Sequence, residues 1–477
     1  MLKMAGFPVA LIALLLLALP RLILIPLHYA PDPNEGWNAF HAIMAASRAT
    51  LYPPPGALTG NNYPPLSFYA VRFIAYFTGD AIIAGRLISL FSILAASALI
   101  WRIVTNITRN KTAAGWAAIL FLAYNVTLFR SYFCLNDPQW LAHAVALLGI
   151  ATLFPAEPAP LARPRIAASS FLLVAAGFVK QNLIGFPAAI TLWLLITHRR
   201  HFALWLLSGA FFTLAGLLLC RLVYGASFLP DLLFSARHYS PARAIIKSLP
   251  ILAALSPMVV ASLRLPRQNK QAALFPIAVT VCLVTGIIQR GGIGVDINAH
   301  FETLIAASIG TGIALAAPAR KRARHWLLAP FIILVPLAAA QSIAALRHLN
   351  LNLANWHSAI AHIAAVPGNV ACDNLAYCYW AGKSYSADFF LYGQRFLQTG
   401  NGTALQEAVN NHSIIAAELP GQPVSCQSNP LAHLFRAAAP AIFYRNKIIE
   451  LAALPTPLPA ASCSNGSAAP PVPRAAN

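Results

Sequence analysis

The sequence predicts a mainly α-helical, polytopic membrane protein with a small C-terminal α/β domain. Hydrophobic residues make up 58% of the 477-residue chain and charged residues only 10%, whereas about 25% of a soluble domain is charged. The apolar residues gather in long runs, and these runs shorten after about residue 344, where Gly, Asn, Gln and Ser become more frequent. We therefore expect a membrane domain over 1–343, a soluble domain over 344–454, and a disordered tail rich in Pro, Ala and Ser over 455–477.

The apolar runs are long enough to form membrane-spanning helices. Residues 7–27 reach the roughly 20 residues that a helix needs to cross the hydrocarbon core. No small-residue cleavage site precedes the hydrophilic loop that follows, so this run is expected to be a retained helix and not a signal peptide. Further runs lie at 81–104, 113–129, 138–154, 166–180, 183–197, 202–222, 245–263, 271–288, 299–317 and 326–343. Together the runs predict about 11 transmembrane helices.

The net charge of +20 is explained by where the basic residues stand. They concentrate at the N-terminus and in the short loops after every second apolar run, an arrangement that keeps those loops cytoplasmic during insertion. These residues are Lys3; Arg102, Arg109 and Lys111; Arg163 and Arg165; Arg199 and Arg200; Arg264, Arg267 and Lys270; and Arg320, Lys321, Arg322 and Arg324. Because membrane topology accounts for this charge, we expect no nucleic-acid partner.

Acidic residues are scarce, with 13 in the whole chain, and they favour the opposite side of the membrane. Those before residue 344 are Asp32, Glu35, Asp80, Asp137, Glu157, Asp231, Asp296 and Glu302, and only Glu157 falls on the basic side. Acids contribute little to helix orientation, so topology does not explain this bias. A polar site on the outer face does.

The outer loop at 28–79 is long and predicts secondary structure of its own. Residues 35–48 place Trp37, Phe40, Ile43 and Met44 on one face of a helix, which is typical of a helix lying in the membrane interface. Residues 66–77 predict a second such helix. In the tail, we expect a strand near 366–373, a helix at 403–411 and a buried strand at 414–417.

An odd number of spans places the part of the chain after residue 344 outside, where its four cysteines would meet an oxidising compartment. Cys372, Cys378, Cys426 and Cys463 could then pair in any of three ways. The remaining cysteines, Cys134, Cys220 and Cys282, lie in or near apolar runs and are expected to be small packing residues.

Five motifs follow one another along the chain. They are the acidic segment Asp32 to Glu35 with the following Trp37-Asn-Ala-Phe-His41; the Tyr-Pro-Pro-Leu segment Tyr63 to Leu66; Asp137 within Leu135 to His143; Asn298 to Glu302 after a Gly-rich loop; and a tail with Pro-Gly-x-Val and Ala-Gly-Lys segments. In this order they resemble the glycosyltransferase C superfamily, and within it the bacterial dolichyl-phosphate-mannose-type and aminoarabinose-type transferases. Many relatives have an adjacent Asp-Glu pair in the first loop, whereas here Asn34 precedes Glu35 and the Asp stands two residues earlier.

The resemblance implies an integral-membrane, inverting glycosyltransferase. Such an enzyme would move a sugar from a polyprenyl-phosphate donor to a lipid, glycan or protein acceptor on the outer face of the bacterial inner membrane. Its active site and C-terminal domain would face the periplasm. A secondary transporter or lipid flippase would share the membrane spans and stays the alternative, although it should show internal repeats and acids near mid-membrane.

The transfer needs a carboxylate that takes the acceptor proton. Asp32 and Glu35 are the two candidates for this base, and the sequence leaves open which of them acts. Asp137 is a candidate for orienting the acceptor, or for holding a divalent metal cation together with His143 or His41. Each acid also has a purely structural interpretation, because Asp32, Glu35 and Asp137 all stand where they could cap a helix.

The transfer also needs cations near the leaving phosphate. The candidates facing outward are Lys180, Arg237, Arg243 and Arg130, with Arg290 as a further one. Lys180 ends an apolar run and could instead snorkel to the lipid headgroups. Glu302, His300 and Tyr63 complete the candidate site, since an acid at the membrane edge is costly and therefore favours a role.

Overall fold

The computed structural model describes residues 6–47, 51–157, 159–233, 237–265, 269–317, 325–426, 428–438 and 441–457. Most of the predicted disordered tail, from residue 458 on, lies outside the described residues. So do several of the predicted cytoplasmic basic residues, among them Lys3, Arg267 and the cluster at 320–324.

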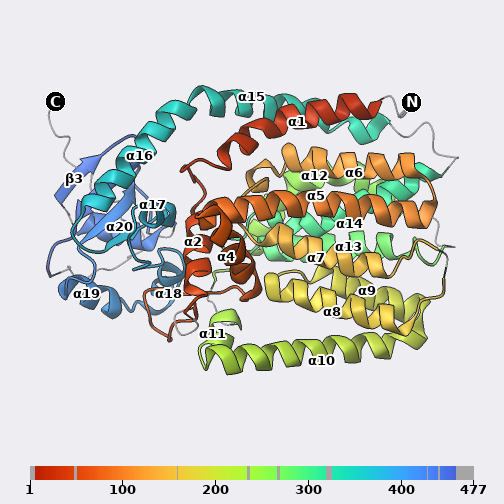
Figure 1. Ribbon diagram of the computed structural model, residues 1–477, viewed down its shortest axis with the longest axis horizontal. Coiled ribbons are helices and arrows are strands. Elements are labelled where there is room, and N and C mark those ends of the chain that lie inside the picture. Colours follow the sequence, from red (N-terminus) through yellow and green to blue (C-terminus); the bar gives the residue numbers. More distant parts are fainter. Residues whose placement is uncertain are drawn as a thin grey trace.

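A bundle of long helices forms one end of the molecule and a smaller α/β domain forms the other (Figure 1). Each predicted apolar run contains a helix. These helices are α1 (Gly6–Leu24), α5 (Ala81–Thr108), α6 (Lys111–Val126), α7 (Gln139–Thr152), α8 (Arg163–Val179), α9 (Gly185–Thr197), α10 (Arg199–Tyr224), α12 (Pro241–Leu263), α13 (Leu274–Arg290), α14 (Phe301–Ala316) and α15 (Phe331–Arg347). Within the described ranges, six helical segments are long and apolar enough to cross a membrane: Gly6–Leu24, Ala81–Thr108, Arg199–Tyr224, Pro241–Leu263, Ile297–Ala316 and His325–Arg347.

Helix α14 forms the centre of the bundle, where it contacts α5, α6, α12 and α13. Small residues allow these helices to approach closely. A Cβ atom on Gly310 would lie 2.3 Å from Ser262 Oγ, and one on Gly312 would lie 2.7 Å from Ala117 Cβ, as is typical of helix packing in membranes. Helix α10, by contrast, lies at the edge with Leu207 and Leu222 largely exposed. A bilayer would cover this apolar surface.

Helices α2 (Pro33–Met44) and α4 (Leu66–Thr78) stand where the sequence predicts two interfacial helices. Asp32 caps α2 by accepting a hydrogen bond from the backbone N–H of Asn34, and Pro33 occupies the first helical position, where its missing N–H costs nothing. On the predicted apolar face of α2, Phe40 is buried in the protein, whereas Ile43 is 48% exposed.

The C-terminal domain is built on a four-stranded sheet with the order β1-β2-β4-β3. Strand β1 (Val370–Cys372) pairs in parallel with β2 (Ala416–Pro420), while β4 (Ile449–Ala453) is antiparallel to both β2 and β3 (Ala441–Arg445). The helices around it are α16 (Leu349–Ala365), α17 (Leu375–Trp380), α18 (Leu391–Thr399), α19 (Thr403–Asn410) and α20 (Pro430–Ala437). The strands predicted near 370 and 414 and the helix predicted at 403 are present. The predicted domain boundary at 343/344 lies within α15.

Disulfides form in this domain. Cys372 is bonded to Cys378, and Cys426 is also disulfide-bonded, whereas Cys463 lies outside the described residues. Cys134, Cys220 and Cys282 are free and buried in the membrane domain, in agreement with their predicted role as packing residues.

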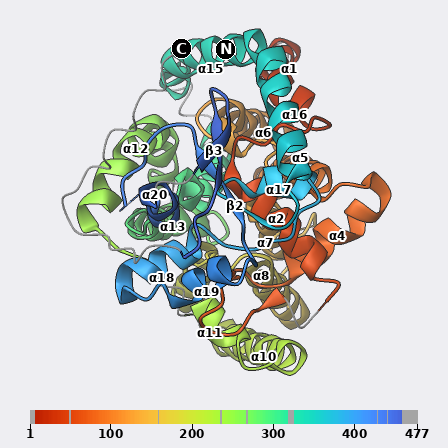
Figure 2. The ribbon, with the colours of Figure 1, turned by 90° about the vertical axis from the view of Figure 1, so that its left-hand side faces the viewer.

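The C-terminal domain docks onto helix α2 through backbone contacts (Figures 1 and 2). A Cβ atom on Gly36 would lie 2.1 Å from the backbone nitrogen of Ala376 on α17. Nearby, Asn374 Nδ2 donates to the carbonyl oxygen of Ala30 at 2.9 Å. Because the neighbour of Gly36 is backbone, no side-chain rotation can make room there for a larger residue.

We expect the substitution Gly36→Ala to loosen this docking. Overpacking typically costs about 1–3 kcal/mol, so the variant should unfold at a lower temperature, and limited proteolysis should cleave its C-terminal domain faster. The matched control is Gly177→Ala on α8, where an added Cβ meets nothing within 4 Å. Equal protease resistance of the two variants would contradict the docking geometry.

Candidate active site

Polar segments from several parts of the membrane domain converge where it meets the C-terminal domain. They are the start of α2, the loop before α7 with the 3₁₀ turn η1 (Arg130–Tyr132), the end of α8, and the loop before α14 with the 3₁₀ turn η2 (Ile297–His300). Tyr132 of η1 is close enough to Asp137, Asp296 and Asp32 for their charges to act on its hydroxyl. The structure thus brings together carboxylates that the sequence placed in separate loops.

Glu35 forms a buried ion pair with Arg86 of α5. Arg86 Nε donates to Glu35 Oε1 at 2.6 Å and a terminal nitrogen donates to Oε2 at 2.8 Å. The remaining N–H groups of Arg86 donate to backbone carbonyl oxygens at the end of α1, including those of Leu27 and Tyr29. The backbone nitrogen of Asn136 adds a third donor to Glu35 Oε1 at 3.2 Å. Both carboxylate oxygens of Glu35 are therefore engaged, and the pair ties α1, α2 and α5 together.

Asp137 forms a second buried ion pair, with Lys180. Lys180 Nζ lies 2.9 Å from each carboxylate oxygen of Asp137 and 4.4 Å from the centre of the Tyr63 ring. Asp137 also accepts a hydrogen bond at 2.8 Å from the backbone nitrogen of Gln139, the first residue of α7, although the N-cap residue of that helix is Pro138. The predicted phosphate-binding cation and the predicted second acid are thus partners of each other.

Asp32 differs from these two acids because no cation pairs with it among the described residues. Within those residues its hydrogen bonds come only from Asn34, whose backbone nitrogen and Nδ2 lie 3.0 and 2.9 Å from Oδ1. Burial raises the pKa of Asp32 to about 6, and the neighbouring carboxylates of Glu35 and Asp137 act in the same direction. A half-buried carboxylate with a pKa close to neutrality and an unused oxygen has the properties of a general base.

The predicted arginines have different surroundings. Arg237 lies with its guanidinium 5.5 Å from the centre of the Phe390 ring, and Arg243 is close enough to Arg290 to influence its charge. Arg290 in turn contacts Asp296 at 3.3 Å. Arg130, in contrast, donates to Gln341 and Ser342 of α15, so its charge is directed towards α15.

The residues predicted to hold a metal ion are His41, His143 and Asp137. His41 has its two ring nitrogens 2.8 and 3.0 Å from the carbonyl oxygens of Trp37 and Gly60, and burial lowers its pKa to about 4. His143 Nε2 faces Gln139 at 3.1 Å. Among the described residues there is no group of three or more His, Cys, Asp or Glu side chains that could hold a metal ion. Asp137 and His41 are engaged by other partners, whereas His143 Nδ1 has no hydrogen-bond partner among the described residues, and a metal held by these residues stays a prediction.

Glu302 and His300 also form hydrogen bonds within the protein. The carboxylate of Glu302 accepts hydrogen bonds from the backbone nitrogens of Gly185 and Phe186 at 2.9 and 2.8 Å. A carboxylate at the N-terminus of α9 is stabilised by the helix dipole. His300 Nε2 lies 3.0 Å from Ser248 Oγ.

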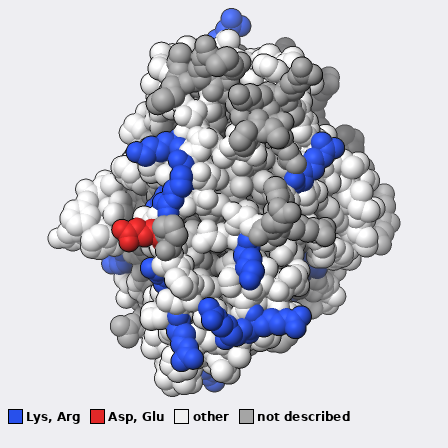
Figure 3. All heavy atoms as spheres, turned by 90° about the vertical axis from the view of Figure 1, so that its right-hand side faces the viewer, with Lys and Arg blue, Asp and Glu red and all other residues white. Residues whose placement is uncertain are grey.

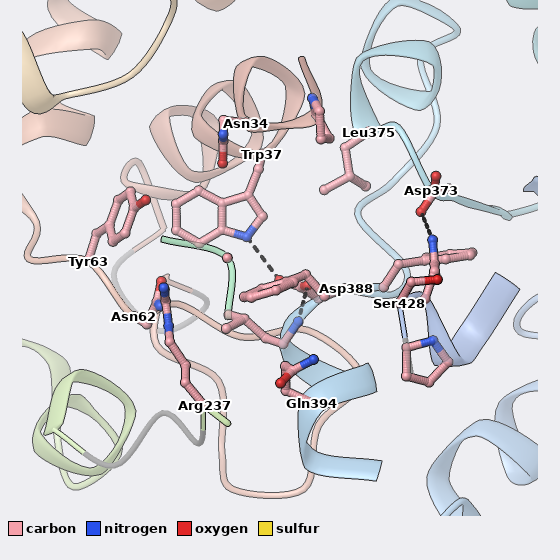
Figure 4. A pocket seen from close by; sticks show the side chains of 17 residues that line it. Asn34, Trp37, Asn62, Tyr63, Arg237, Asp373, Leu375, Asp388, Gln394 and Ser428 are labelled. Carbon is pink, nitrogen blue, oxygen red and sulfur yellow. Dashed lines mark hydrogen bonds between the residues drawn. The ribbon is translucent and has the colours of Figure 1, made fainter. Parts of the chain in front are cut away.

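A cavity of about 370 Å³ lies between these loops and the C-terminal domain (Figure 4). From the membrane domain it is lined by Pro33, Asn34, Trp37, Asn62, Tyr63, Arg237 and Gly294, and from the C-terminal domain by Asp373, Leu375, Asp388, Phe389, Phe390, Leu391, Gln394, Ser428, Asn429 and Pro430. Trp37 Nε1 donates to Asp388 Oδ2 at 2.9 Å across the interface. Asp32 itself is not a lining residue, but the two residues that follow it in the chain, Pro33 and Asn34, are.

Comparisons with known proteins agree with this architecture. No protein-family model and no curated protein matches the sequence. Among solved structures, the chain is similar to ArnT from Cupriavidus metallidurans bound to undecaprenyl phosphate, with 14% identity, a TM-score of 0.62, and coverage of 96% of this chain and 99% of ArnT. The apo state of the same protein gives a TM-score of 0.58, 14% identity, and coverage of 94% and 96%. The chain has the ArnT fold.

The ArnT fold confirms the predicted resemblance at the level of architecture. The likeness extends over the membrane domain and the C-terminal domain together. The oligosaccharyltransferase AglB from Archaeoglobus fulgidus, in complex with an inhibitory peptide and a dolichol-phosphate, is more distant, with a TM-score of 0.47, 11% identity, and coverage of 91% of this chain and 72% of AglB.

Several residues of this candidate site are not predictable from the sequence. Arg86 lies inside an apolar run, where the cost of a charge signals a buried partner, but the sequence does not say which one. Tyr132 is one of 14 tyrosines and carries no distinguishing pattern. Asp373 and Asp388 lie in the tail, and the scarcity of acids was the signal that could have found them.

Proposed function

We propose that this chain is a membrane glycosyltransferase that moves a sugar from a polyprenyl-phosphate donor to an acceptor of the cell envelope, with Asp32 as the general base. The observation that carries the proposal is the contrast among three acids: Glu35 and Asp137 are held by cations, whereas Asp32, unpaired among the described residues, directly precedes two residues that line a cavity. The ArnT fold supports the choice of donor, because the similar structure holds undecaprenyl phosphate.

The proposed chemistry is a single displacement. Asp32 takes the proton of an acceptor hydroxyl while the acceptor oxygen bonds to the anomeric carbon of the sugar. The bond between that carbon and the phosphate oxygen breaks, and the lipid phosphate leaves with the electron pair. Attack opposite to the leaving group inverts the anomeric configuration. General-base assistance of this kind contributes typically about 10²–10⁴-fold.

The cations near Asp32 would stabilise the departing phosphate. Lys180 is the best placed, since its buried ammonium lies against the ring of Tyr63, which also lines the cavity. Arg237 at the cavity wall and the pair of Arg243 and Arg290 would add charge from the outer side. In this proposal Asp137 orients Lys180, and the pair of Glu35 and Arg86 positions the segment that carries Asp32.

The site and the C-terminal domain are proposed to face the periplasm. Disulfides form and persist in oxidising compartments, and this domain contains Cys372–Cys378. The end of the bundle far from this domain presents mainly Lys and Arg among its charged side chains (Figure 3), as expected for cytoplasmic loops.

Cysteine labelling tests this orientation. In intact cells, a membrane-impermeant maleimide should label a Gly400→Cys variant, at the exposed end of α18, and should not label Lys111→Cys between α5 and α6. Both positions should react after the membrane is permeabilised. Labelling of both positions in intact cells would contradict the topology and, with it, the periplasmic site.

The function itself is tested with purified protein in liposomes. The protein is given undecaprenyl-phosphate glucose and an envelope extract, and the release of undecaprenyl phosphate and the mass of the glycosylated product are followed by mass spectrometry. The proposal predicts transfer from the lipid-linked donor. Transfer from a soluble nucleotide sugar would overturn it, and movement of the lipid across the bilayer without transfer would favour the alternative of a transporter or flippase.

A further inference from the structure

The cavity between α2 and the C-terminal domain contains polar side chains whose hydrogen-bonding capacity is unused within the described residues. Asn62 and Gln394 are only 5% and 3% exposed, and both line the cavity. Within the part of the chain that the structure describes, neither side-chain amide has a hydrogen-bond partner. Buried amides are normally paired, so these two mark positions where a ligand would donate and accept hydrogen bonds. Figure 4 shows them around the same space as Trp37 and Arg237.

The charges of the lining argue against an anionic ligand. Asp373 and Asp388 face one cation, Arg237, whose guanidinium lies over the ring of Phe390. Asp388 is saturated, because it accepts hydrogen bonds from Trp37, from the hydroxyl of Tyr385 at 2.7 Å and from the backbone of Leu391 at 2.7 Å. Among the lining residues a phosphate or carboxylate would meet one cation, Arg237, and not the paired cations that anions need.

Amides together with aromatic rings suit a neutral polyhydroxylated ring. Each Asn or Gln amide offers both donors and an acceptor, which matches sugar hydroxyls that do both. Trp37, Tyr63 and Phe390 supply apolar surface for the C–H faces of such a ring. The volume of about 370 Å³ is at the small end of the range for small-ligand sites, roughly 300–1,000 Å³.

We propose that this cavity binds a neutral sugar unit of the acceptor, so that the acceptor hydroxyl belongs to a glycan. The inference rests on the proposed transferase function and specifies its acceptor. The position supports the acceptor side of the reaction. Tyr63 forms part of the cavity wall, and Lys180, the proposed phosphate-binding cation, lies against the ring of Tyr63. Asp32, the proposed base, directly precedes Pro33 and Asn34 of the lining in the chain.

Binding of a simple glycoside tests the chemistry of the cavity. Full-length protein in lipid nanodiscs is titrated with methyl β-glucopyranoside and, separately, with glucose 6-phosphate, by saturation-transfer NMR. We expect saturable binding of the glycoside, and no tighter binding of the phosphate. Gln394→Leu and Asn62→Leu should each weaken the glycoside about three- to tenfold, the loss expected for a hydrogen bond between neutral groups. Gln398→Leu, at an exposed position of the same helix, should bind like the wild type.

Two binding results would overturn the assignment of a neutral-sugar site. One is wild-type affinity in both cavity variants, each checked for folding by its thermal unfolding midpoint. The other is preferential binding of glucose 6-phosphate. The sugar could also belong to the donor, so glycoside binding is repeated with saturating undecaprenyl phosphate and with undecaprenyl-phosphate glucose. If the glycoside still binds in the presence of either lipid, the cavity is assigned to the acceptor sugar. If only the glucose-bearing lipid displaces the glycoside, the cavity is assigned to the donor sugar.

Failure of this inference is distinguishable from failure of the proposed function. If the protein binds the glycoside through Gln394 but transfers no sugar, the cavity is a sugar-binding site and the proposed transferase function is wrong. If Gln394→Leu and Asn62→Leu both transfer sugar at the wild-type rate, the transferase function is supported and the assignment of the cavity to the acceptor is wrong.

Discussion

Substitution of Asp32 by Asn is expected to reduce sugar transfer by about 10²–10⁴-fold, because the amide cannot take the acceptor proton. Wild-type transfer should decline as the pH falls through about 6, since burial raises the pKa of Asp32 to that value and protonation removes the base. This decline of the rate at low pH is the acidic limb of the pH profile. The residual activity of the Asp32→Asn variant should lack it. Both are measured as the rate of lipid-phosphate release across the pH range 4.5–8, roughly two units to each side of that pKa.

The same substitution should leave the protein as stable as before, or more so. A carboxyl group whose pKa is higher in the folded state binds its proton more tightly there. The contribution of this group to stability is therefore greatest below its pKa in the unfolded chain, near 4, and is lost as the pH rises through its pKa in the folded protein, about 6. At pH 7 the charged Asp32 carries a desolvation cost that a neutral amide side chain removes, so Asp32→Asn should not lower the unfolding midpoint.

Asp231 provides a matched control, because burial raises its pKa to about 6 as well, and it lies on α11 (Phe228–Leu233) outside the cavity lining. Asp231→Asn should retain transfer and the acidic limb. If Asp32→Asn transfers sugar at the wild-type rate, Asp32 is not the base. If Asp231→Asn loses the limb, the assignment of that pKa is wrong.

Breaking the ion pair of Glu35 and Arg86 is expected to have the largest effect on stability. Removing one partner of a buried pair costs about 3–5 kcal/mol, because it leaves an uncompensated charge. Glu35→Gln and Arg86→Gln should each lower the yield of folded protein and the unfolding midpoint. The double variant should recover part of this loss but not all of it, since the carbonyl oxygens at the end of α1 also depend on Arg86.

The pH profile separates this positioning role from catalysis. Folded Glu35→Gln protein should transfer sugar more slowly and still show the acidic limb near pH 6, since Asp32 remains. Arg72→Gln on α4 is the control for removing an arginine, because Arg72 makes only an exposed contact of 3.3 Å to a backbone carbonyl. A Glu35→Gln variant with normal stability and no acidic limb would identify Glu35 as the base.

The fold was largely predictable because helix formation in a membrane depends on local composition. An apolar run of sufficient length becomes a helix whatever its neighbours are, and each predicted run contains one. The interfacial helices and the strands of the tail followed from equally local patterns. The predicted gathering of Asp32, Glu35, Asp137 and Lys180 also agrees with the structure, because loops on one face of a membrane have little space in which to separate.

The pairing of these residues was not predictable, because it depends on how helices rotate and slide against one another. Glu35 and Arg86 are in contact although they are 51 residues apart in the sequence. Trp37 and Asp388 are in contact although they are 351 residues apart. Arg130 turns towards α15 for the same reason. Periodicity identifies the buried face of a helix, but it does not identify which side chain of another helix will lie opposite.

The contact of Gly36 with α17 has a consequence for biosynthesis. The part of the C-terminal domain that touches α2 is the short loop closed by Cys372–Cys378, and it joins Ala30 through Asn374, which is 344 residues further along the chain. Ribosomes synthesise the α2 segment early and this loop late. In the proposed topology the loop must also cross the membrane and be oxidised before it docks. The cavity wall is thus one of the last parts to be completed, and a chain that is still being translated carries its base without the pocket that would present an acceptor to it.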